Sequence, residues 1–373
     1  MTALPISRRA LLASSATALS CSRPRATGFL GYCLIANRDG KSIGVVDLNK
    51  FRARKAIGLD SPPSLVLAHP SQPRALVLAP LAGTIYEIDA LRLAVSRRVR
   101  VGSQAAAMKV SPAADALWCL YREPPALVEV PLDEFQPRRR IRLTAPPDDF
   151  DLSRENRAAI IQRHSRKILI VSLTRSAMER TVVAQDEPSL IQFRYDGTHL
   201  LAASRIGRSL TIFDVATGRT VVRLPLSLEP RNFCVTPDGG QLFISGDGMD
   251  AVVVVYPYLS EVAETLLAGR APDGMAATDT TPPYLLVTNP SSDGVTVLNI
   301  DTGTLAAAVQ VGQEPRHILI TPDRQYALVL NEKSGDLAVI RLYSLAARRN
   351  KPIPLFTLIP VGERPVSAAV IPL

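Results

Sequence analysis

The stretch Pro315-Arg316-His317-Ile318-Leu319-Ile320-Thr321-Pro322-Asp323 is an altered copy of Pro230-Arg231-Asn232-Phe233-Cys234-Val235-Thr236-Pro237-Asp238-Gly239. A more degenerate copy begins Pro188-Ser189-Leu190-Ile191-Gln192-Phe193-Arg194-Tyr195-Asp196-Gly197. After each copy come a second short apolar run, a Gly-containing turn and a third apolar run. Short β-branched and aliphatic runs separated by turn residues are typical of β-strands, so the repeated unit is predicted to be a small antiparallel sheet.

The repeat continues along the chain at nearly constant spacing. Its anchor positions are Pro63, Ala105, Pro147, Pro188, Pro230, Pro272, Pro315 and Pro365, at intervals of 42, 42, 41, 42, 42, 43 and 50 residues. The last interval is longer because an Arg/Lys/Pro-rich insertion occupies 344–354. Matching segments at 214–218 and 299–303 are predicted to turn from a third into a fourth strand. Four short strands in about 42 residues are the pattern of a β-propeller blade.

The two ends of the chain are predicted to share a blade. Residues 32–47 carry a second and a third strand with no first strand before them, whereas 365–373 carry a first strand with nothing after it. Pairing them closes the ring and leaves no unpaired strand edges. We therefore predict a single all-β propeller over 29–373, with eight four-stranded blades. Seven blades are the alternative if the weakest unit, 147–187, is distorted.

Several of these segments resemble a known repeat. Tyr284-Leu-Leu-Val-Thr-Asn289, Asp293-Gly294-Val295-Thr-Val-Leu-Asn299 and Val311-Gly312 resemble the YVTN-type β-propeller repeat of surface-layer and YncE-like periplasmic proteins. The resemblance extends over about residues 30–373 and is weakest in 105–187. It implies a propeller with an extracytoplasmic binding or scaffold role, in a family whose activity is usually unassigned. Such repeats specify a fold far better than a function.

The N-terminus has the features of an export signal. Ser7-Arg8-Arg9-Ala10-Leu11-Leu12 precedes a short apolar run and resembles the twin-arginine motif; an ordinary export signal with two arginines is the alternative. Ala18-Leu19-Ser20-Cys21 resembles a lipobox, although Ala18 and Leu19 depart from its pattern, so cleavage without an anchor is the alternative to lipidation of Cys21. We expect an export signal over 1–21, a tether over 22–28, and a periplasmic or cell-envelope protein with membrane attachment through Cys21.

The chain is basic, with a formal net charge of +9. Two arginine clusters lie in or beside alternating segments: Arg97, Arg98 and Arg100, and then Arg138, Arg139, Arg140 and Arg142. They indicate either a surface for acidic polymers or lipid headgroups, or charges that protect solvent-facing edge strands from aggregation. We favour the second interpretation. Because no aromatic side chains alternate with these arginines, we expect no nucleic-acid partner.

The thiols, histidines and carboxylates form no recognisable reactive motif. Cys33, Cys119 and Cys234 lie in apolar runs of three different units, so we expect buried free thiols rather than a disulfide. No histidine pairs with another ligand at metal spacing on one element, and no EF-type loop is present. We therefore predict neither a metal site nor a cofactor. Acidic residues with a weaker claim to bind Ca²⁺ are Asp148, Asp149, Asp151, Asp247 and Asp250.

The channel mouth is the best positional candidate for a site. The first strand of each blade lines the channel, so residues just after the anchors gather around one opening. Among them, Arg231 and Arg316 could bind a carboxylate or another anion, and His317 could titrate near neutral pH. Asp148 and Asp273 could either join this site or simply offset the arginine charges.

We favour a non-enzymatic propeller that binds an envelope protein, a peptide or a small molecule at this mouth. The alternative is a lactonase-like propeller hydrolase, which would need an acid/base group such as His317 or Asp273 there. A haem or quinone redox role is a third hypothesis; the absence of a haem-attachment motif and the single Trp118 argue against it.

Overall fold

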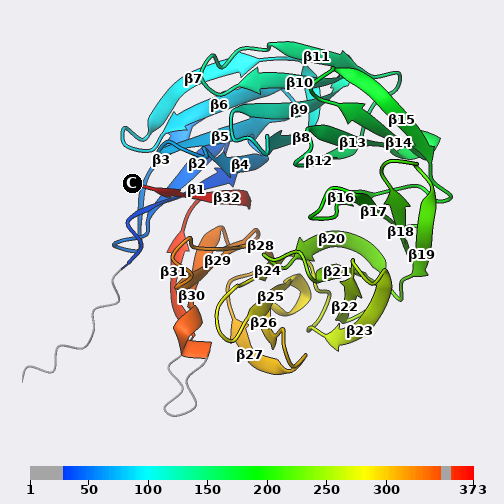
Figure 1. The fold of residues 1–373 in the computed structure, drawn as a ribbon. Helices are drawn as coiled ribbons and strands as arrows, with labels where there is room; N and C mark the ends of the chain where they lie inside the picture. The colour runs from blue at the N-terminus through cyan, green and yellow to red at the C-terminus, as the bar shows by residue number, and fades with distance from the viewer. Residues whose placement is uncertain (1–27, 346–353) are drawn as a thin grey trace, which may run out of the picture.

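Eight four-stranded antiparallel sheets form a ring in the computed structural model, which describes residues 28–345 and 354–373. Figure 1 shows the sheets arranged around a common centre, with the first strand of each blade innermost. The prediction of an all-β propeller with eight blades is confirmed. The unit at 147–187, whose loss would have left seven blades, forms a complete sheet. Within the described ranges, no helix has the length and apolar character needed to cross a membrane.

The first four blades run from the N-terminal strands to Val183. We letter the blades A to H and give their strands from the innermost outward. Blade A contains β32 (Pro365–Pro372), β1 (Gly31–Asn37), β2 (Ser42–Asp47) and β3 (Arg52–Gly58). Blade B contains β4 (Leu65–Ala68), β5 (Arg74–Ala79), β6 (Thr84–Asp89) and β7 (Ala94–Arg100). Blade C contains β8 (Ser103–Val110), β9 (Ala116–Glu123), β10 (Pro125–Pro131) and β11 (Arg139–Arg142). Blade D contains β12 (Asp149–Leu152), β13 (Arg157–Gln162), β14 (Lys167–Ser172) and β15 (Ala177–Val183).

The remaining blades complete the ring. Blade E contains β16 (Leu190–Phe193), β17 (His199–Ser204), β18 (Ser209–Asp214) and β19 (Thr220–Pro225). Blade F contains β20 (Glu229–Val235), β21 (Leu242–Asp247), β22 (Ala251–Tyr256) and β23 (Glu261–Leu267). Blade G contains β24 (Met275–Ala277), β25 (Tyr284–Asn289), β26 (Gly294–Asn299) and β27 (Leu305–Gln310). Blade H contains β28 (Pro315–Ile320), β29 (Tyr326–Asn331), β30 (Asp336–Arg341) and β31 (Leu355–Pro360). The described residues also form three short 3₁₀ helices: η1 (Arg163–Ser165), η2 (Pro290–Ser292) and η3 (Leu342–Leu345).

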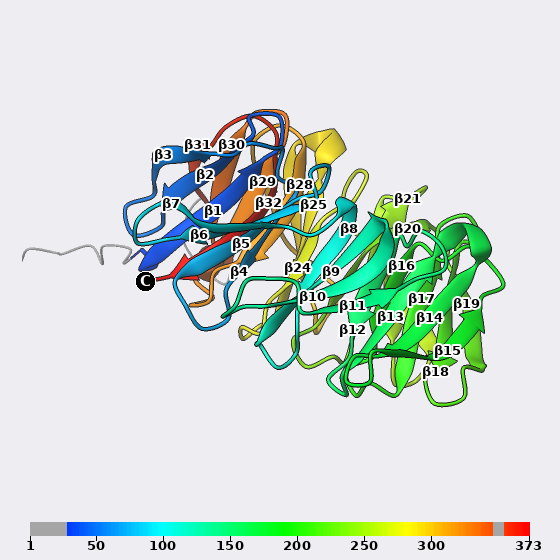
Figure 2. The same ribbon diagram turned by 90° about the horizontal axis from the view of Figure 1, so that it is seen from above.

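The two chain ends pair in blade A, as predicted. Strand β32 runs antiparallel to β1, and Tyr32 lies opposite Ile371 while Cys33 lies opposite Val370. Figures 1 and 2 both show β32 beside β1. Because strands from opposite ends of the sequence complete one sheet, the ring can close only when the whole chain has folded.

The core is divided among the junctions between blades. Eight hydrophobic clusters exist, and each joins the facing sides of two neighbouring blades. Along β1, Cys33 and Ile35 pack toward blade H, whereas Leu34 and Ala36 pack toward blade B. Successive side chains of a strand point to opposite faces, so a strand covered on both faces must be apolar throughout. This explains why the second and third strands of the blades appear in the sequence as nearly continuous apolar runs. Each fully buried aliphatic side chain contributes roughly 1.5–3 kcal/mol.

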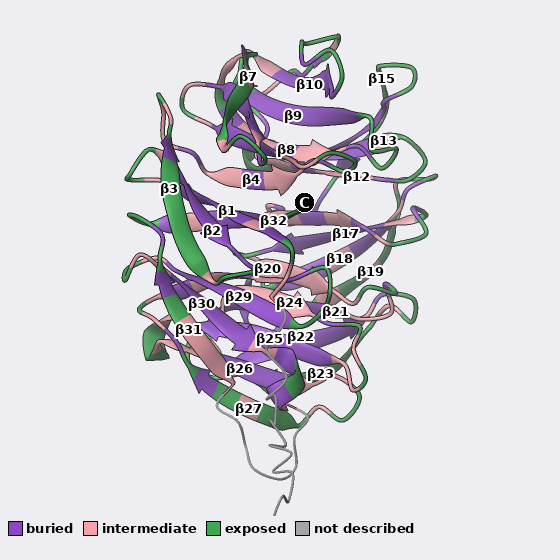
Figure 3. Ribbon diagram, turned by 90° about the vertical axis from the view of Figure 1, so that its left-hand side faces the viewer, coloured by how far each residue is buried: buried purple, intermediate pink, exposed green. Residues whose placement is uncertain are grey.

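The outermost strands are the exposed ones. Figure 3 shows β3 and β27 largely in green beside the purple middle strands. The turn before each outer strand from β3 to β27 contains a residue in the left-handed conformation, at positions 51, 93, 135, 176, 218, 260 and 303. These positions have the same intervals as the anchors, but glycine occupies only Gly218 and Gly303. The backbone geometry therefore repeats even where the residue that favours it has been replaced.

Candidate functional site

Topology brings two kinds of loop to one end of the channel. In an antiparallel blade, the start of the first strand lies beside the end of the second strand. The loops that enter each blade and the hairpins between its second and third strands therefore surround the same opening, which we call the mouth. The hairpins between first and second strands and between third and fourth strands lie at the opposite end.

Arg231 and Arg316 occupy equivalent places in blades F and H. Each is the extra residue of a β-bulge, since the pairing shifts between Pro230 and Asn232 and again between Pro315 and His317. A bulge changes the direction in which a side chain leaves the strand. The repeat thus positions both arginines by the same backbone irregularity at the start of the innermost strand.

Arg231 is held by a carboxylate of its own blade. Its Nε lies 2.9 Å from Oδ2 of Asp247, and the same oxygen is 2.6 Å from Nη2 of Arg205 in blade E. Glu229 pairs with Arg205 at 3.4 Å and with Arg208 at 3.0 Å. These contacts join the mouth loops of blades E and F and leave Arg231 with a neutralising partner.

Arg316 is paired in the same manner with its neighbours. Its Nη1 lies 2.9 Å from Oδ2 of Asp273 in blade G, and its Nε lies 3.9 Å from Oε2 of Glu332. Glu332 also faces Arg364 at 3.6 Å, which in turn reaches Asp39 of blade A at 3.8 Å. The structure therefore brings Arg316 and Asp273 together and extends them into a chain of charges across blades G, H and A.

Asp148 lies apart from these groups. In blade D it accepts a hydrogen bond from the backbone N–H of Arg163 at 2.8 Å and lies 3.4 Å from Nη2 of Arg122 in blade C. It therefore offsets an arginine, but a different one from Arg231 or Arg316. Four of the five mouth residues predicted from the sequence are thus distributed over three separate contacts around the opening.

His317 follows Arg316 but is less accessible to solvent. Burial lowers the pKa of its imidazole, and a hydrogen bond with the backbone of Ala368 acts in the opposite direction. The ring thus lies between β28 and β32, in the junction of blades H and A. The imidazole therefore gains its proton at a lower pH than an ordinary histidine does, and it is neutral at neutral pH.

A cleft of about 670 Å³ opens at the mouth where blades H and A meet. Its charged lining consists of four carboxylates and two cations: Asp39, Glu314, Glu332, Glu363, Lys333 and Arg364. Glu332 and Asp39 take part in the ion pairs described above. Neither Glu314 nor Glu363 has an ion-pair partner among the residues that the structure describes. The cleft therefore carries an excess of negative charge beside Arg316.

Most of this cleft was not predicted from the sequence. Its carboxylates lie on second-to-third-strand hairpins and in the loops before the anchors, whereas only the residues after the anchors were considered. The signal was available, because Glu332 follows the end of a predicted second strand and Glu314 directly precedes the anchor Pro315. Antiparallel pairing alone places both at the mouth.

The remaining candidate groups are dispersed. Cys33 and Cys119 are buried free thiols, and Cys234 is a partly buried one; burial raises the pKa of Cys33 to about 12 and that of Cys234 to about 11. Across 28–345 and 354–373, no three His, Cys, Asp or Glu side chains are grouped closely enough to hold a metal ion. The predicted export signal with Arg8 and Arg9, the lipidation residue Cys21 and all but the last residue of the tether lie outside the described residues.

Comparison with solved structures shows the same fold in proteins of different kinds. The hydrazine synthase of Kuenenia stuttgartiensis is 21% identical, with a TM-score of 0.60 over 76% of this chain and 96% of that chain. Dihydro-heme d1 dehydrogenase NirN, in complex with DHE, is 15% identical, with a TM-score of 0.73 over 92% of this chain and 76% of that chain. A functionally unknown protein from Desulfotomaculum acetoxidans is 13% identical, with a TM-score of 0.60 over 74% and 95% of the two chains.

No family model matches the chain, and no curated protein matches it by sequence. The solved structures support the propeller fold, and at these identities they show the fold alone. The YVTN-type resemblance therefore still depends on the motifs quoted above.

Proposed function

We propose that this chain is a non-enzymatic binding propeller of the cell envelope, which holds a basic segment of a partner polypeptide at its mouth. The observation that carries the proposal is the cleft between blades H and A. Its volume of about 670 Å³ lies within the range of roughly 300–1,000 Å³ that is typical of ligand sites. Its four carboxylates outnumber its two cations.

The charge of the cleft favours a cationic partner. Glu314 is partly buried and Glu363 is exposed, and neither is neutralised by an arginine or lysine of the described chain. Lysine or arginine side chains of a partner would supply the missing charges. The mouth arginines Arg231 and Arg316 are already occupied by Asp247 and Asp273, so they favour an anionic ligand less than the sequence alone suggested.

The placement of the cleft suits an extended partner. It adjoins Arg316, and the ion-paired loops of blades E and F continue around the same opening. A polypeptide could therefore contact several blades while its basic side chains occupy the cleft. Export by the leader, expected from Arg8 and Arg9, would place this face outside the cytoplasm.

A synthetic lysine-rich peptide tests the proposal. Since the whole chain has a net charge of +9, a cationic peptide gains nothing from non-specific attraction, and binding reports a local acidic site. We expect saturable binding, measured by fluorescence anisotropy, that weakens by about tenfold in the double variant Glu314→Gln/Glu363→Gln. The matched control, Glu261→Gln/Glu264→Gln, makes the same charge change on the exposed outer strand β23 and should bind as the unaltered protein does. The proposal is wrong if the peptide does not bind, or if both double variants lose binding equally.

A further inference from the structure

A second candidate site lies at the end of the channel opposite the mouth. A groove of about 330 Å³ separates the turns of blades B and C, and we call it the B–C groove. The polar side chains that line it are His69, Ser71, Gln72, Asp115, Asp133 and Arg138. None of them belongs to the mouth described above.

The repeat makes His69 an exception. The turn after each innermost strand starts at a residue whose backbone N–H bonds the carbonyl at or just before the start of the second strand. In five of the seven first-to-second-strand turns this residue is Ser or Thr, and its hydroxyl accepts a backbone N–H of the turn: Ser111, Ser153, Thr236, Thr278 and Thr321. Blade E has Arg194 there, and blade B has His69. One hydroxyl acceptor therefore satisfies the hydrogen bonding of this turn. An imidazole carries a second ring nitrogen that the turn does not use.

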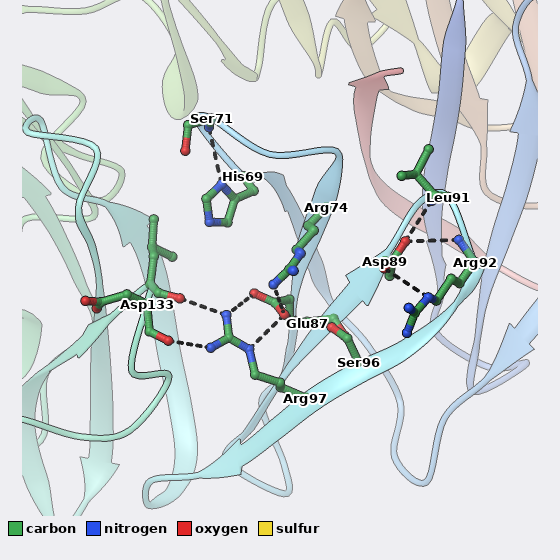
Figure 4. A network of polar contacts seen from close by, with 11 residues as sticks. His69, Ser71, Arg74, Glu87, Asp89, Leu91, Arg92, Ser96, Arg97 and Asp133 are labelled. Carbon is green, nitrogen blue, oxygen red and sulfur yellow. Dashed lines mark hydrogen bonds and ion pairs between the residues drawn. The ribbon is translucent and has the colours of Figure 1, made fainter.

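One ring nitrogen of His69 acts as the hydrogen-bond acceptor in place of the hydroxyl. The other ring nitrogen takes no part in the turn. The backbone N–H of Ser71 donates to Nδ1 at 3.2 Å, as Figure 4 shows. In the neutral ring Nδ1 is then the acceptor and Nε2 carries the hydrogen. His69 is only 8% exposed, yet Nε2 has no hydrogen-bond partner among the described residues. His69 lines the B–C groove, so this N–H donor is available to a ligand there.

This tautomer of His69 disfavours a metal ion as the ligand of Nε2. A metal ion would need the lone pair of Nε2, which is available only if Nδ1 gives up the bond from Ser71. Burial lowers the pKa of His69, and the nearby Arg74 and Arg97 lower it further, while Glu87 acts against them. His69 therefore remains a neutral donor, suited to an acceptor atom of a ligand.

The ion-paired side chains near His69 and Arg138 carry an excess of positive charge beside the groove. Below His69, the fully buried Glu87 is shared by Arg74 at 2.9 Å and Arg97 at 2.5 Å, so one carboxylate meets two guanidinium groups. On the blade C side, Glu129 is likewise shared by Arg138 and Arg139. Arg138 uses Nε and Nη2 for this contact, which leaves Nη1 available to a ligand.

The rim of the groove carries the opposite charge. Asp115 and Asp133 are exposed, and the described part of the chain engages only one carboxylate oxygen of each. Ser111 donates its hydroxyl to Oδ1 of Asp115, and the backbone N–H of Glu134 donates to Oδ1 of Asp133. The donors of His69 and Arg138 therefore line the groove, with the excess positive charge beside them, while free carboxylate oxygens lie at its rim.

From this polarity we propose that the B–C groove binds a small zwitterion of the free α-amino acid class. Its carboxylate would accept hydrogen bonds from Nε2 of His69 and Nη1 of Arg138, and its ammonium group would lie between Asp115 and Asp133. The volume of about 330 Å³ is at the lower end of ligand sites and suits a ligand of this size. No Phe, Tyr or Trp side chain lines the groove, which disfavours a ligand held by stacking on a large flat face.

The ring supplies its own control. The corresponding F–G groove, of about 290 Å³, lies four blades further along the chain and contains Thr236 in place of His69 and Asp301 in place of Asp133. It has no counterpart of the donor Arg138; its charged lining is Asp238, Asp279 and Asp301. Variants of the two grooves can therefore be matched residue by residue.

Calorimetric titration with each of the twenty proteinogenic amino acids, up to about 10 mM, tests the proposal on the mature chain. We expect at least one to bind. His69→Ser, which restores the hydroxyl of the other turns, should weaken it by at least about tenfold, and Asp133→Asn should weaken it as well. Thr236→Ser, Asp301→Asn and the mouth variant Glu314→Gln/Glu363→Gln should leave it unchanged. Denaturant unfolding of each variant checks that the fold is retained; if His69→Ser is unfolded, Arg138→Lys takes its place and should weaken binding in the same way.

Two derivatives of the best ligand test the orientation. The amide lacks the carboxylate charge and the N-acetyl form lacks the ammonium charge, and we expect both to bind at least about tenfold more weakly, because a site built to bond a group rejects an analogue without it. The inference is overturned if no amino acid binds, if His69→Ser binds as tightly as the unaltered chain, or if either derivative binds as tightly as the parent amino acid.

Discussion

Arg97 donates two hydrogen bonds to the buried carboxylate of Glu87, of 2.8 Å from Nε and 2.5 Å from Nη2. Its Nη1 and Nη2 also donate to the backbone carbonyls of Asp133 and Leu132 in the next blade. One side chain thus joins an ion pair within blade B to the backbone of blade C. The arrangement recurs one repeat later, where Arg139 holds Glu129 and reaches the carbonyl of Leu173 in blade D. These contacts connect successive blades at their outer ends, beyond the apolar junctions.

Replacing Arg97 is therefore expected to destabilise the fold strongly. Arg97→Ala leaves Glu87, which has no exposed surface, with Arg74 and the hydroxyl of Ser96 as partners, and it also removes the guanidinium from above the ring of Phe135. Breaking a buried pair costs about 3–5 kcal/mol, and because these partners remain, we expect a loss of about 3 kcal/mol. Denaturant unfolding measures it.

The neighbouring Arg98 provides the control. Its pair with Asp60 is exposed on both sides, and such pairs are worth roughly 0–1 kcal/mol. Arg98→Ala should therefore change the free energy of unfolding by less than about 1 kcal/mol. Equal losses in the two variants would contradict the structural role given to Arg97.

The sequence revealed the blades because the backbone repeats more faithfully than the residues do. The regularly spaced anchors, clearest at Pro230 and Pro315, predicted the eight blades, and the incomplete units at the two chain ends predicted the closure. The Arg97–Glu87 contact was missed: the arginines were interpreted as charges on exposed edge strands, although the interval between Glu87 and Glu129 is the repeat length. The location of the mouth was predicted, but its ion pairs were not. These pairs depend on side-chain directions that are set by β-bulges, and the residue types do not predict a bulge.

Closure through β32 is expected to carry a large share of the stability. Val370 is 8% exposed and packs in the junction of blades H and A. Val370→Asp would place an unpaired carboxylate in that apolar junction and should destabilise the fold by about 3 kcal/mol or more. Leu373→Asp, at the exposed end of the same segment, should have little effect. Similar unfolding midpoints for the two variants would show that the terminal strand does not seal the ring.

Membrane attachment is predicted to depend on a single thiol of the leader. If Cys21 is lipidated, Cys21→Ser should move the expressed protein from the detergent phase to the aqueous phase in a temperature-induced Triton X-114 separation. Cys33→Ser is the matched control, because burial raises the pKa of that thiol to about 12 and keeps it inert. An unaltered Cys21 protein that partitions into the aqueous phase would favour cleavage without an anchor.

Export is predicted to require both arginines of the leader. The twin-arginine interpretation predicts that Arg8→Lys/Arg9→Lys, which keeps both charges, retains the protein in the cytoplasm. An ordinary export signal reads charge rather than the arginine pair, so unchanged export of this variant would support the alternative. Cell fractionation after induction distinguishes the two.

Stability is expected to fall between about pH 7.5 and pH 5.5 because of buried histidines. Burial lowers the pKa values of His69 and His317, so in this window the unfolded chain binds more protons than the folded chain. The free energy of unfolding then rises with pH through the window, by at most about 1.4 kcal/mol per pH unit for each histidine. The lowered pKa values of Glu87 and Glu129 act in the same sense as the histidines, because the unfolded carboxyl groups bind more protons. Their effect comes as the pH falls below about 4.5, outside this window.

Two substitutions isolate the contribution of His317. His317→Gln removes one proton-binding group of the unfolded chain, so the difference in unfolding free energy between the two pH values should be smaller than in the unaltered protein. His164→Gln changes a histidine that is exposed on η1 and is hydrated in both states, and it should retain the full difference. Urea unfolding at both pH values measures this. If His317→Gln and His164→Gln show the same difference, the junction of blades H and A does not hold a neutral imidazole.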